Sequence, residues 1–524
     1  MLAVAGLVGA AVAALFTGML YVSDNAKLPS YEQLQRHPPS RGYDLVDLAA
    51  PTLTGFGLRL LAWISRTPVL GRLIIRHFHK NANAKTSSAP FKHWTISDYT
   101  TRYASGELSP VQVARAVIEA LAHSETGDKP LRIMVEKHDE LILEQALASA
   151  KRYAKGTPLG VLDGVPVAVK DEMEIAGHRM NVGTSFLGDA FGVAEEDALP
   201  VKRLRAQGAM ILGTANMHEI GIGVTGFNKT NGTTRNPGPA AAVASGIVPL
   251  AVGIDGGGSI RIPAALCGIV GIKPTFMRVP PLSPDCPSVS HIGPIACSVR
   301  DAAIGYALTA SLSGLRVGYY GAFINHSSPE IASAVKDALQ QLEQRGAELV
   351  EVELDHLNAI HLAHSMTITA EMAQNLDKFY SEFCAKASPE TQIMLSNARH
   401  MTATDFLQDK VFSKVDVLVS PSTAITAPEI PRAALSYGEL NTAQLGRIMR
   451  YSVYGNFVGN PGVAVPIGYD AKGLPISLQV QSSHFQEDVM LRVAHAAETI
   501  YASKQKQPEA YYSILDAATK HERM

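Results

Sequence analysis

The sequence feature that most restricts the fold is a glycine-rich stretch at residues 253–268, which runs on to residue 275. Gly256, Gly257 and Gly258 precede Ser259 and leave their backbone N–H groups uncovered by side chains. Glycine also tolerates the backbone angles that turn such groups inward. Convergent N–H groups beside a hydroxyl suit acyl transfer, in which the serine attacks a carbonyl carbon and the N–H groups stabilise the oxyanion. We therefore predict Ser259 as the nucleophile and the N–H groups of Gly256, Gly257, Gly258 and Ser259 as the oxyanion hole.

Two other interpretations fit this stretch when it is taken alone. It could be a tight glycine turn, or a loop that cradles a phosphate. A phosphate loop closes with Gly-Lys-Ser or Gly-Lys-Thr, whereas Ser-Ile-Arg-Ile-Pro closes this one. Asp255 and Arg261 flank the loop, and we expect them to pair and brace it.

Further motifs lie upstream of the glycine-rich stretch. They are Gly164-Val-Pro-Val-Ala-Val-Lys-Asp-Glu172, Gly213-Thr-Ala-Asn-Met-His-Glu219 and Gly232-Thr-Thr-Arg-Asn-Pro237. Together with the stretch at 253–275 they resemble the amidase signature family, over roughly residues 95–500. The Asn-Met-His-Glu run and the form Asp-Gly-Gly-Gly-Ser are most similar to plant-type fatty acid amide hydrolases.

The order of expected elements predicts an α/β fold. Capping boxes at Thr95 and Ser109 mark helix starts, and the second opens a helix at 111–122. Further helices are expected at 140–153 and 331–345. Short apolar runs predict buried strands at 165–169, 210–212 and 417–420. This alternation predicts a mixed, mostly parallel sheet covered by helices on both faces. The resemblance implies that residues 94–505 form one amidase signature domain, followed by a polar tail at 506–524.

Length, charge and cysteine content narrow the function classes. A chain of 524 residues can bury a large core, and its net charge of −2 with a pI near 6.8 gives no global attraction to nucleic acid. The four cysteines, at positions 267, 286, 297 and 384, have no metal-type spacing and read as reduced thiols of an intracellular protein. We expect no metal and no organic cofactor.

The first 25 residues are expected to form a transmembrane anchor. Residues 2–22 are an uncharged apolar run of about the length that spans a bilayer as a helix. A cleaved signal peptide is the competing interpretation. Such a peptide requires a basic n-region and a cleavage site of small residues, and neither is evident in this sequence. Lys27, Arg36 and Arg41 follow the run and nothing basic precedes it, which places the body in the cytoplasm, on an endomembrane.

Residues 26–93 are expected to be a membrane-associated region and linker. Five basic residues punctuate an apolar run at 55–80, and no acidic residue occurs between Asp47 and Asp98. Basic charge on an apolar helix, with Trp63 and Phe78 as interfacial anchors, suits a segment lying on an anionic membrane surface. The alternative is a helix packed on the enzyme's own body, with its arginines at the rim.

Lys170 is the predicted general base. It ends an apolar strand, where desolvation can make an amine a base, although a lysine at such a place is more often a salt-bridge residue. In the family, the matching lysine acts through a bridging serine that deprotonates the nucleophile. Lys170 and Ser259 match the family's motifs, but the bridging serine is absent, because Asn236-Pro237 runs directly into Gly238 and an Ala-rich segment. Thr233, Thr234 and Ser245 are the nearest hydroxyls, and none occupies the motif.

Two more places look shortened relative to the family, one between residues 301 and 315 and one between 405 and 415. Clean gaps in otherwise matched sequence indicate omitted exons or misplaced intron boundaries rather than point substitution.

Three candidate functions follow from the motifs, the expected membrane segments and the missing serine. The first is a membrane-associated serine amidase acting on fatty acid amides, and the second is a catalytically impaired pseudoenzyme that keeps the fold. The third, a glutamine-amidase subunit for tRNA charging, has no use for a membrane anchor. The expected partners are the lipid bilayer, a fatty acid amide and, in a homodimer, a second copy of the chain.

Overall fold

The computed structural model describes most of the chain from residue 91 onwards. The described residues are 91–234, 238–276, 278–279, 286, 288–306, 316–344, 347–354, 357–383, 391, 412, 414–431 and 441–521. The predicted anchor at 1–25 and nearly all of the region at 26–93 lie outside them. Among the helices in these ranges, none combines the length and the apolar character that crossing a bilayer requires.

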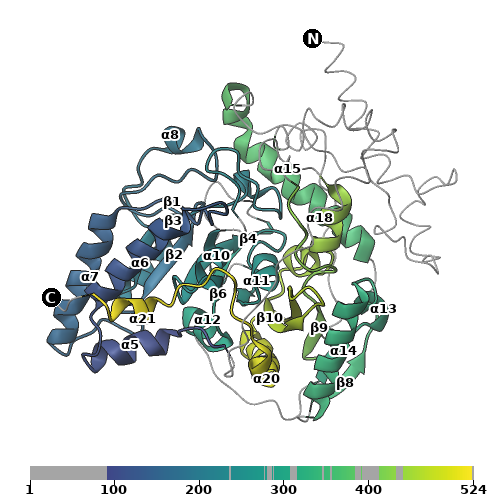
Figure 1. Cartoon of the computed structure of the whole chain (residues 1–524). Coiled ribbons are helices and arrows are strands. Elements are labelled where there is room, and N and C mark those ends of the chain that lie inside the picture. Colours follow the sequence, from purple (N-terminus) through teal and green to yellow (C-terminus); the bar gives the residue numbers. More distant parts are fainter. Residues whose placement is uncertain are drawn as a thin grey trace, which may run out of the picture.

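The described strands form a single sheet that runs through the molecule (Figure 1). Its strand order is β1-β3-β2-β4-β6-β5-β10-β11-β9-β7-β8. The strands are β1 (Met134–Glu136), β2 (Pro166–Lys170), β3 (Met210–Ala215), β4 (Leu250–Asp255), β5 (Val270–Lys273), β6 (His291–Ala296), β7 (Arg316–Tyr319), β8 (Glu348–Glu351), β9 (Val417–Pro421), β10 (Gly462–Tyr469) and β11 (Pro475–Ser482).

The prediction of a mostly parallel sheet is wrong. Among the described strands four pairings are parallel and six are antiparallel, so the sheet is mixed. One physical reason is the hairpin between β10 and β11, where Asp470 accepts from the N–H groups of Gly473 and Leu474. Two strands joined by so short a turn must run antiparallel. Alternating helices and strands predict parallel strands joined by crossovers, whereas β10 and β11 follow each other with no helix between them.

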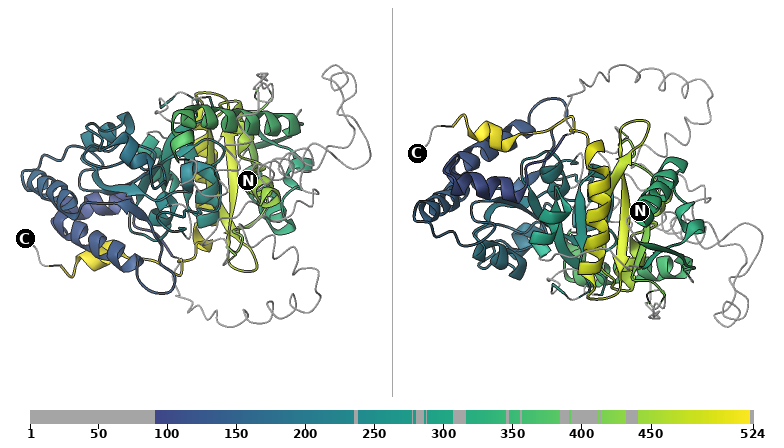
Figure 2. Two further views of the ribbon diagram at one scale, coloured as in Figure 1. Left: turned by 90° about the horizontal axis from the view of Figure 1, so that it is seen from above. Right: turned by 90° about the horizontal axis from the view of Figure 1, so that it is seen from below.

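Helices lie on both sides of the sheet, as predicted (Figure 2). Helices α10 and α11 contact each other and the strands around β4 and β10, while α20 contacts both α12 and α14, and all three contact the same sheet. The helices are α5 (Ile96–Ala104), α6 (Pro110–Ser124), α7 (Asp139–Ala154), α8 (Leu187–Phe191), α9 (Leu199–Ala206), α10 (Gly238–Ala244), α11 (Arg261–Cys267), α12 (Val299–Tyr306), α13 (Gly321–Ile324), α14 (Pro329–Gln344), α15 (Leu357–Phe383), α18 (Thr442–Met449), α19 (Val453–Phe457), α20 (Glu487–Tyr501) and α21 (Ile514–Ala518), with 3₁₀ turns at Glu219–Gly221 and Ala502–Lys504.

Local signals placed the first elements correctly. Both predicted capping boxes form, because Thr95 and Asp98 cap α5 reciprocally and Ser109 and Gln112 cap α6 in the same way. Each box satisfies two backbone groups that a helix start would otherwise leave unpaired. The residues of β2, β3, β4 and β9 are all buried, as expected of short apolar runs in the middle of a sheet.

The C-terminal segment is not the polar tail that we predicted from the sequence. Helix α21 packs on α6 and buries Ile514, Leu515 and Ala518. The Gln112 amide also donates to the His521 carbonyl at 2.7 Å, and the Trp94 indole donates to Ser513 at 2.9 Å. Helix α21 and the residues around it therefore pack against the first helices of the folded body.

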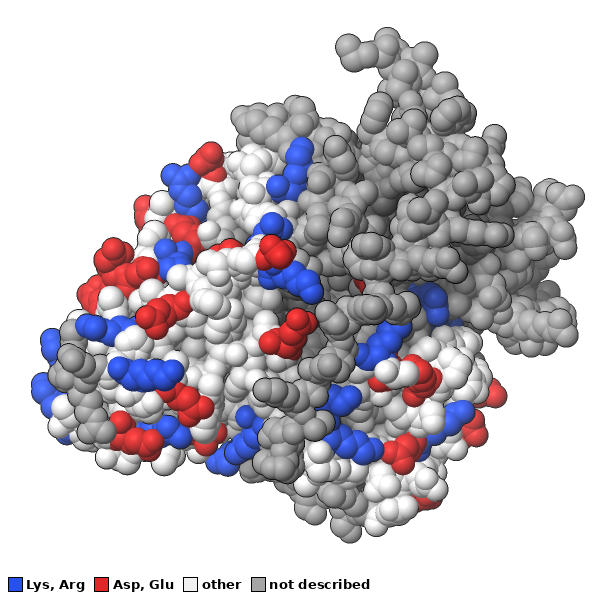
Figure 3. All heavy atoms as spheres, viewed as in Figure 1, with Lys and Arg blue, Asp and Glu red and all other residues white. Residues whose placement is uncertain are grey.

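Charged side chains are dispersed over the face of the molecule that Figure 3 draws. On the face drawn in Figure 3, Lys and Arg side chains are interspersed with Asp and Glu, without a large patch of one sign. This pattern agrees with the small net charge of the chain.

Candidate active site

Two neighbouring parallel strands bring Lys170 and the glycine-rich loop to the same edge of the sheet. Strands β2 and β4 are in register, with Val169 beside Val252, so Lys170 at the end of β2 lies next to Gly253. A side-chain carbon added at Gly253 would lie 3.9 Å from Cδ of Lys170. Strand β4 ends at Asp255, and the loop to Ser259 follows at once. Carboxyl ends of parallel strands are where open α/β sheets bind ligands.

The predicted pair of Asp255 and Arg261 braces this loop. Both side chains are fully buried, and the guanidinium meets the carboxylate through two nitrogens, Nε to Oδ2 at 3.1 Å and Nη2 to Oδ1 at 3.0 Å. The same carboxylate also accepts from the N–H groups of Gly258, Ile260 and Arg261. Burial opposes ionisation of Asp255, but the charge and hydrogen bonds of Arg261 outweigh it and hold the pKa well below the usual value.

Residues from the C-terminal half complete the support of Arg261. Its Nη1 donates to Gln479 Oε1 at 2.8 Å and to the carbonyl oxygen of Ser452 at 3.0 Å. Asn456 accepts from Nη2 and donates in turn to the Asp255 carboxylate at 2.9 Å. Every nitrogen of the buried guanidinium therefore has a partner, as a charge away from water requires.

The network changes the expected set of oxyanion donors. Gly258 N–H donates to Asp255 Oδ1 at 2.7 Å, so its proton holds the loop in shape. Within the described part of the chain, no residue accepts a hydrogen bond from the N–H of Gly257 or Ser259. The inclusion of Gly258 in the oxyanion hole is thus wrong for the conformation seen, and Gly256, Gly257 and Ser259 remain as candidate donors.

The glycines of the loop are required by its backbone and by its neighbours. Gly258 has φ +129°, which side-chain-bearing residues rarely adopt, and an added Cβ would come 2.3 Å from Ile262 Cδ1. At Gly257 the added atom would come 2.7 Å from Met449 Cε and 3.1 Å from His364 Cε1. The loop is therefore enclosed by α11, α15 and α18.

His364 on α15 is a contact that sequence reasoning missed. Its Nε2 lies 2.7 Å from the carbonyl oxygen of Gly256. Burial lowers the pKa of His364 to about 4, so the imidazole is neutral at physiological pH. A carbonyl oxygen only accepts, so Nε2 carries the proton of this neutral ring.

Lys170 is buried and has two polar partners among the described residues. Its Nζ donates to the carbonyl oxygen of Ile254 at 3.3 Å and forms an ion pair with Glu172, two residues further along the chain. No described serine or threonine hydroxyl is hydrogen-bonded to Lys170. The break in the proton relay stays a prediction, because residues 235–237 lie outside the described part of the chain.

Helix α10 follows the first place where the sequence predicts a shortened segment. Residues 235–237 lie outside the described part, and the helix begins at Gly238, whose N–H donates to the carbonyl oxygen of Asn216. Pro239 lies in the first turn, where a helix needs no N–H donor. The three hydroxyls nearest to this segment in the sequence, those of Thr233, Thr234 and Ser245, lie in different surroundings. Thr233 accepts from Asn228 N–H, and Thr234 is buried. Ser245 follows the C-terminal end of α10 and donates to the carbonyl oxygen of Ala242 in that helix.

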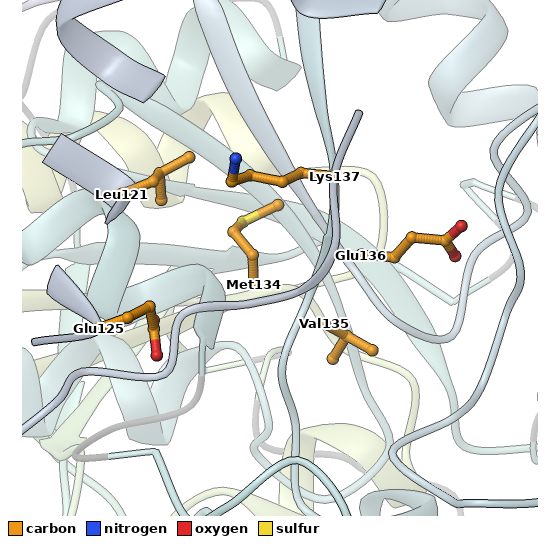
Figure 4. Close-up of a pocket in the computed structure, with 6 residues that line it drawn as sticks. All are labelled: Leu121, Glu125, Met134, Val135, Glu136 and Lys137. Carbon is orange, nitrogen blue, oxygen red and sulfur yellow. The ribbon is translucent and has the colours of Figure 1, made fainter. Parts of the chain in front are cut away.

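The described residues were also compared with the requirements of a metal site, a disulfide and a second pocket. No cluster of His, Cys, Asp or Glu among them has the arrangement of a metal site, and their three cysteines are free thiols. A hollow of about 390 Å³ lies beside the edge strand β1, where Leu121, Met134 and Lys137 point toward one another (Figure 4). Strands β3 and β2 separate β1 from β4, so this hollow is not the nucleophile's pocket.

Comparison with known proteins identifies the family. The sequence profile of the Amidase family matches residues 116–310, 306–409 and 407–491. The chain is 35% identical to a fatty acid amide hydrolase of Medicago truncatula, over 83% of this chain and 80% of the relative. The chain belongs to the amidase signature family.

Two further relatives support this assignment. A fatty acid amide hydrolase of Oryza sativa subsp. indica is 31% identical over 91% of this chain and 97% of its own length. The crystal structure of an amidase superposes with a TM-score of 0.67 at 25% identity, covering 78% of this chain and all of the other. This protein is thus a hydrolase of the amidase type, similar to the plant enzymes.

The comparisons also bear on the shortened segments. The family match breaks at residues 306–310 and again at 407–409, beside the two later places where the chain looks shortened. The alignment with the rice enzyme spans 593 positions, more than the 524 residues of this chain. The rice amidase therefore has segments with no counterpart here.

Proposed function

We propose that this amidase is a membrane-associated enzyme that hydrolyses fatty acid amides of the N-acylethanolamine type through an acyl-enzyme on Ser259. One observation carries the chemistry. Ser259 follows a glycine loop locked by buried Asp255 and Arg261, at the strand end next to Lys170. The substrate class rests on the similarity to the fatty acid amide hydrolases of Medicago and rice.

The reaction has two halves. Ser259 Oγ attacks the amide carbon, its proton leaves towards Lys170, and the oxyanion accepts from the free N–H groups of the loop, Gly257 and Ser259 among them. The C–N bond then breaks, the amine leaves with a proton, and water hydrolyses the ester on Ser259 to release the fatty acid. No step requires a metal or an organic cofactor.

A second candidate function is that of a catalytically impaired amidase. Lys170 contacts Ile254 and Glu172 and no described hydroxyl, so nothing described links it to Ser259. Positioned acid–base catalysis contributes on the order of 10²–10⁴ in rate. A chain that folds and binds acyl chains but turns over slowly is the expected result of losing that link.

A fluorophosphonate probe separates these candidates, because only an activated serine reacts with it. We expect covalent labelling that disappears in Ser259→Ala, together with slow release of amine from an N-acylethanolamine. Labelling without any fatty amide turnover would place the substrate outside this class. An unlabelled, folded protein would establish the impaired form. Lys170→Ala should slow labelling most near neutral pH, and an unchanged pH profile would count against Lys170 as the base.

The membrane part of the proposal rests on the sequence at 2–22 and 55–80. We expect the full chain to resist carbonate extraction from membranes. A chain without residues 1–25 should bind anionic vesicles in a salt-sensitive way through the second segment. If that shortened form stays wholly in the supernatant at low salt, residues 55–80 do not bind membranes.

A further inference from the structure

The orientation of one peptide group in the catalytic loop depends on a residue far away in the sequence. The carbonyl of Gly256 and the N–H of Gly257 belong to the same planar trans peptide and point in opposite directions. Whatever holds the carbonyl therefore sets the direction of the N–H. In this structure the holder is His364 Nε2, at 2.7 Å from the carbonyl oxygen.

The two neighbours of this peptide cannot hold it by themselves. Gly256 and Gly257 both lack a side chain, and glycine rotates about its backbone bonds more freely than any other residue. The Asp255 carboxylate holds the next N–H, that of Gly258, and the two that follow Ser259. Among the described residues, the His364 bond is therefore the contact that fixes the Gly256–Gly257 peptide.

Helix α15 is packed closely enough to make this contact rigid. His364 Cε1 lies 3.1 Å, and Ile368 Cδ1 3.0 Å, from the positions that side-chain carbons at Gly257 and Gly256 would occupy. His364 is completely buried, so no water competes with its bond to the carbonyl. The ring is neutral and adds no charge beside the buried Arg261.

We propose that His364 is a positioning residue of this amidase, which turns the Gly257 N–H toward the oxyanion by holding the Gly256 carbonyl; the inference rests on the proposed use of Ser259. His364 touches neither the nucleophile nor the substrate in this role. Losing it lets the peptide rotate, and the reaction then loses one oxyanion donor. One such donor is worth about 10²–10³ in rate.

Two substitutions of His364 distinguish its hydrogen bond to the Gly256 carbonyl from its contribution to packing. The amide nitrogen of glutamine sits about as far along the side chain as Nε2, so His364→Gln can still donate to the carbonyl. In His364→Asn the amide is one bond shorter and cannot reach. His361→Ala, one turn earlier on α15, controls for the loss of a half-buried imidazole that makes no hydrogen bond to the described loop.

The measurement is the second-order rate of fluorophosphonate labelling, with kcat and KM on a fatty acid amide and the melting temperature alongside. We expect His364→Asn to slow labelling and kcat about a hundredfold or more, with KM nearly unchanged, and His364→Gln to stay within about tenfold of wild type. His361→Ala should change stability without this loss of rate.

The outcomes distinguish the positioning role of His364 from the proposed role of Ser259 as nucleophile. If wild-type protein labels but the Asn and Gln variants behave alike, or if KM rises as much as kcat falls, the positioning role is wrong and the proposed nucleophile stands. If folded wild-type protein does not label at all, the proposed function fails and this inference fails with it.

Discussion

Replacing Asp255 by asparagine tests how the catalytic loop is held. The two side chains have the same shape, but the carboxylate accepts hydrogen bonds at both oxygens. Oδ1 accepts from Gly258, Arg261 and Asn456, and Oδ2 accepts from Ile260 and twice from Arg261. Whichever oxygen becomes an NH₂ group will face three donors and no acceptor.

The expected cost follows from burial. Arg261 and Asp255 are both completely buried, so Asp255→Asn leaves a guanidinium in the core without a counter-charge. Breaking such a pair by removing one partner destabilises by about 3–5 kcal/mol. For a folded body of roughly 430 residues, with about 2.1 cal/mol/K of unfolding entropy per residue, this lowers the melting temperature by roughly 3–6 °C.

Activity should fall more than stability alone explains. The Gly258 N–H loses its acceptor, so the loop that carries Ser259 and the oxyanion donors relaxes even in folded protein. We expect kcat to fall about a hundredfold, the low end of what one misplaced oxyanion donor costs. Calorimetry and steady-state kinetics on the same preparations give both numbers.

Asp163→Asn is the matched control. Asp163 is also buried and pairs with an arginine through two nitrogens, Arg152 Nε at 2.8 Å and Nη2 at 2.6 Å, but it lies between α7 and β2, away from the loop. Arg152 is partly exposed, so its lost partner is replaced in part by water and the destabilisation should be smaller. Unchanged kcat in Asp163→Asn beside a large loss in Asp255→Asn is the expected pair of results. Equal kcat in Asp255→Asn and wild type would refute the role given to Asp255.

The pH dependence has a definite sign. The pKa of Asp255 is held well below the ordinary carboxyl value of about 3.9, chiefly by Arg261 acting against the cost of burial. A carboxyl with a depressed folded-state pKa contributes stability above its unfolded pKa and loses it as pH falls through the folded one. The difference in melting temperature between wild type and Asp255→Asn should therefore be constant from about pH 5 to 8 and shrink only in acid.

Three shorter predictions concern other parts of the chain. Inserting Gly-Gly-Ser-Ser after Pro237 should raise fatty amide turnover at least about a hundredfold, whereas Gly-Gly-Ala-Ala should not; equal, robust rates without the insert would mean that another hydroxyl serves as the bridge. Gly258→Ala should abolish labelling of Ser259, because its φ of +129° and the 2.3 Å approach to Ile262 exclude a side chain; normal labelling would show that the loop is not rigid. Ending the chain after residue 505 should lower the melting temperature, because α21 buries Ile514 and Leu515, and an unchanged value would show that α21 adds nothing to the core.

Local pattern was enough to find much of this fold. A capping box works within four residues, so Thr95 and Ser109 marked the starts of α5 and α6 correctly. Short apolar runs marked β2, β3 and β9 because a strand buried on both faces needs no polar position. Sheet direction was missed, since it depends on which strands become neighbours in space.

In the active site, too, local sequence determined some features and tertiary structure decided others. Three glycines before Ser259, flanked by Asp255 and Arg261, determined the loop and its brace, because all of these contacts lie within six residues of one another. The sequence also predicts that the bridging hydroxyl is missing, and this stays a prediction because residues 235–237 lie outside the described part of the chain. Only tertiary structure brought Gln479 to Arg261 across 218 positions and His364 to Gly256 across 108. It also assigned the Gly258 N–H to Asp255, because the direction of a backbone N–H depends on torsion angles that glycine leaves open and the surrounding packing settles.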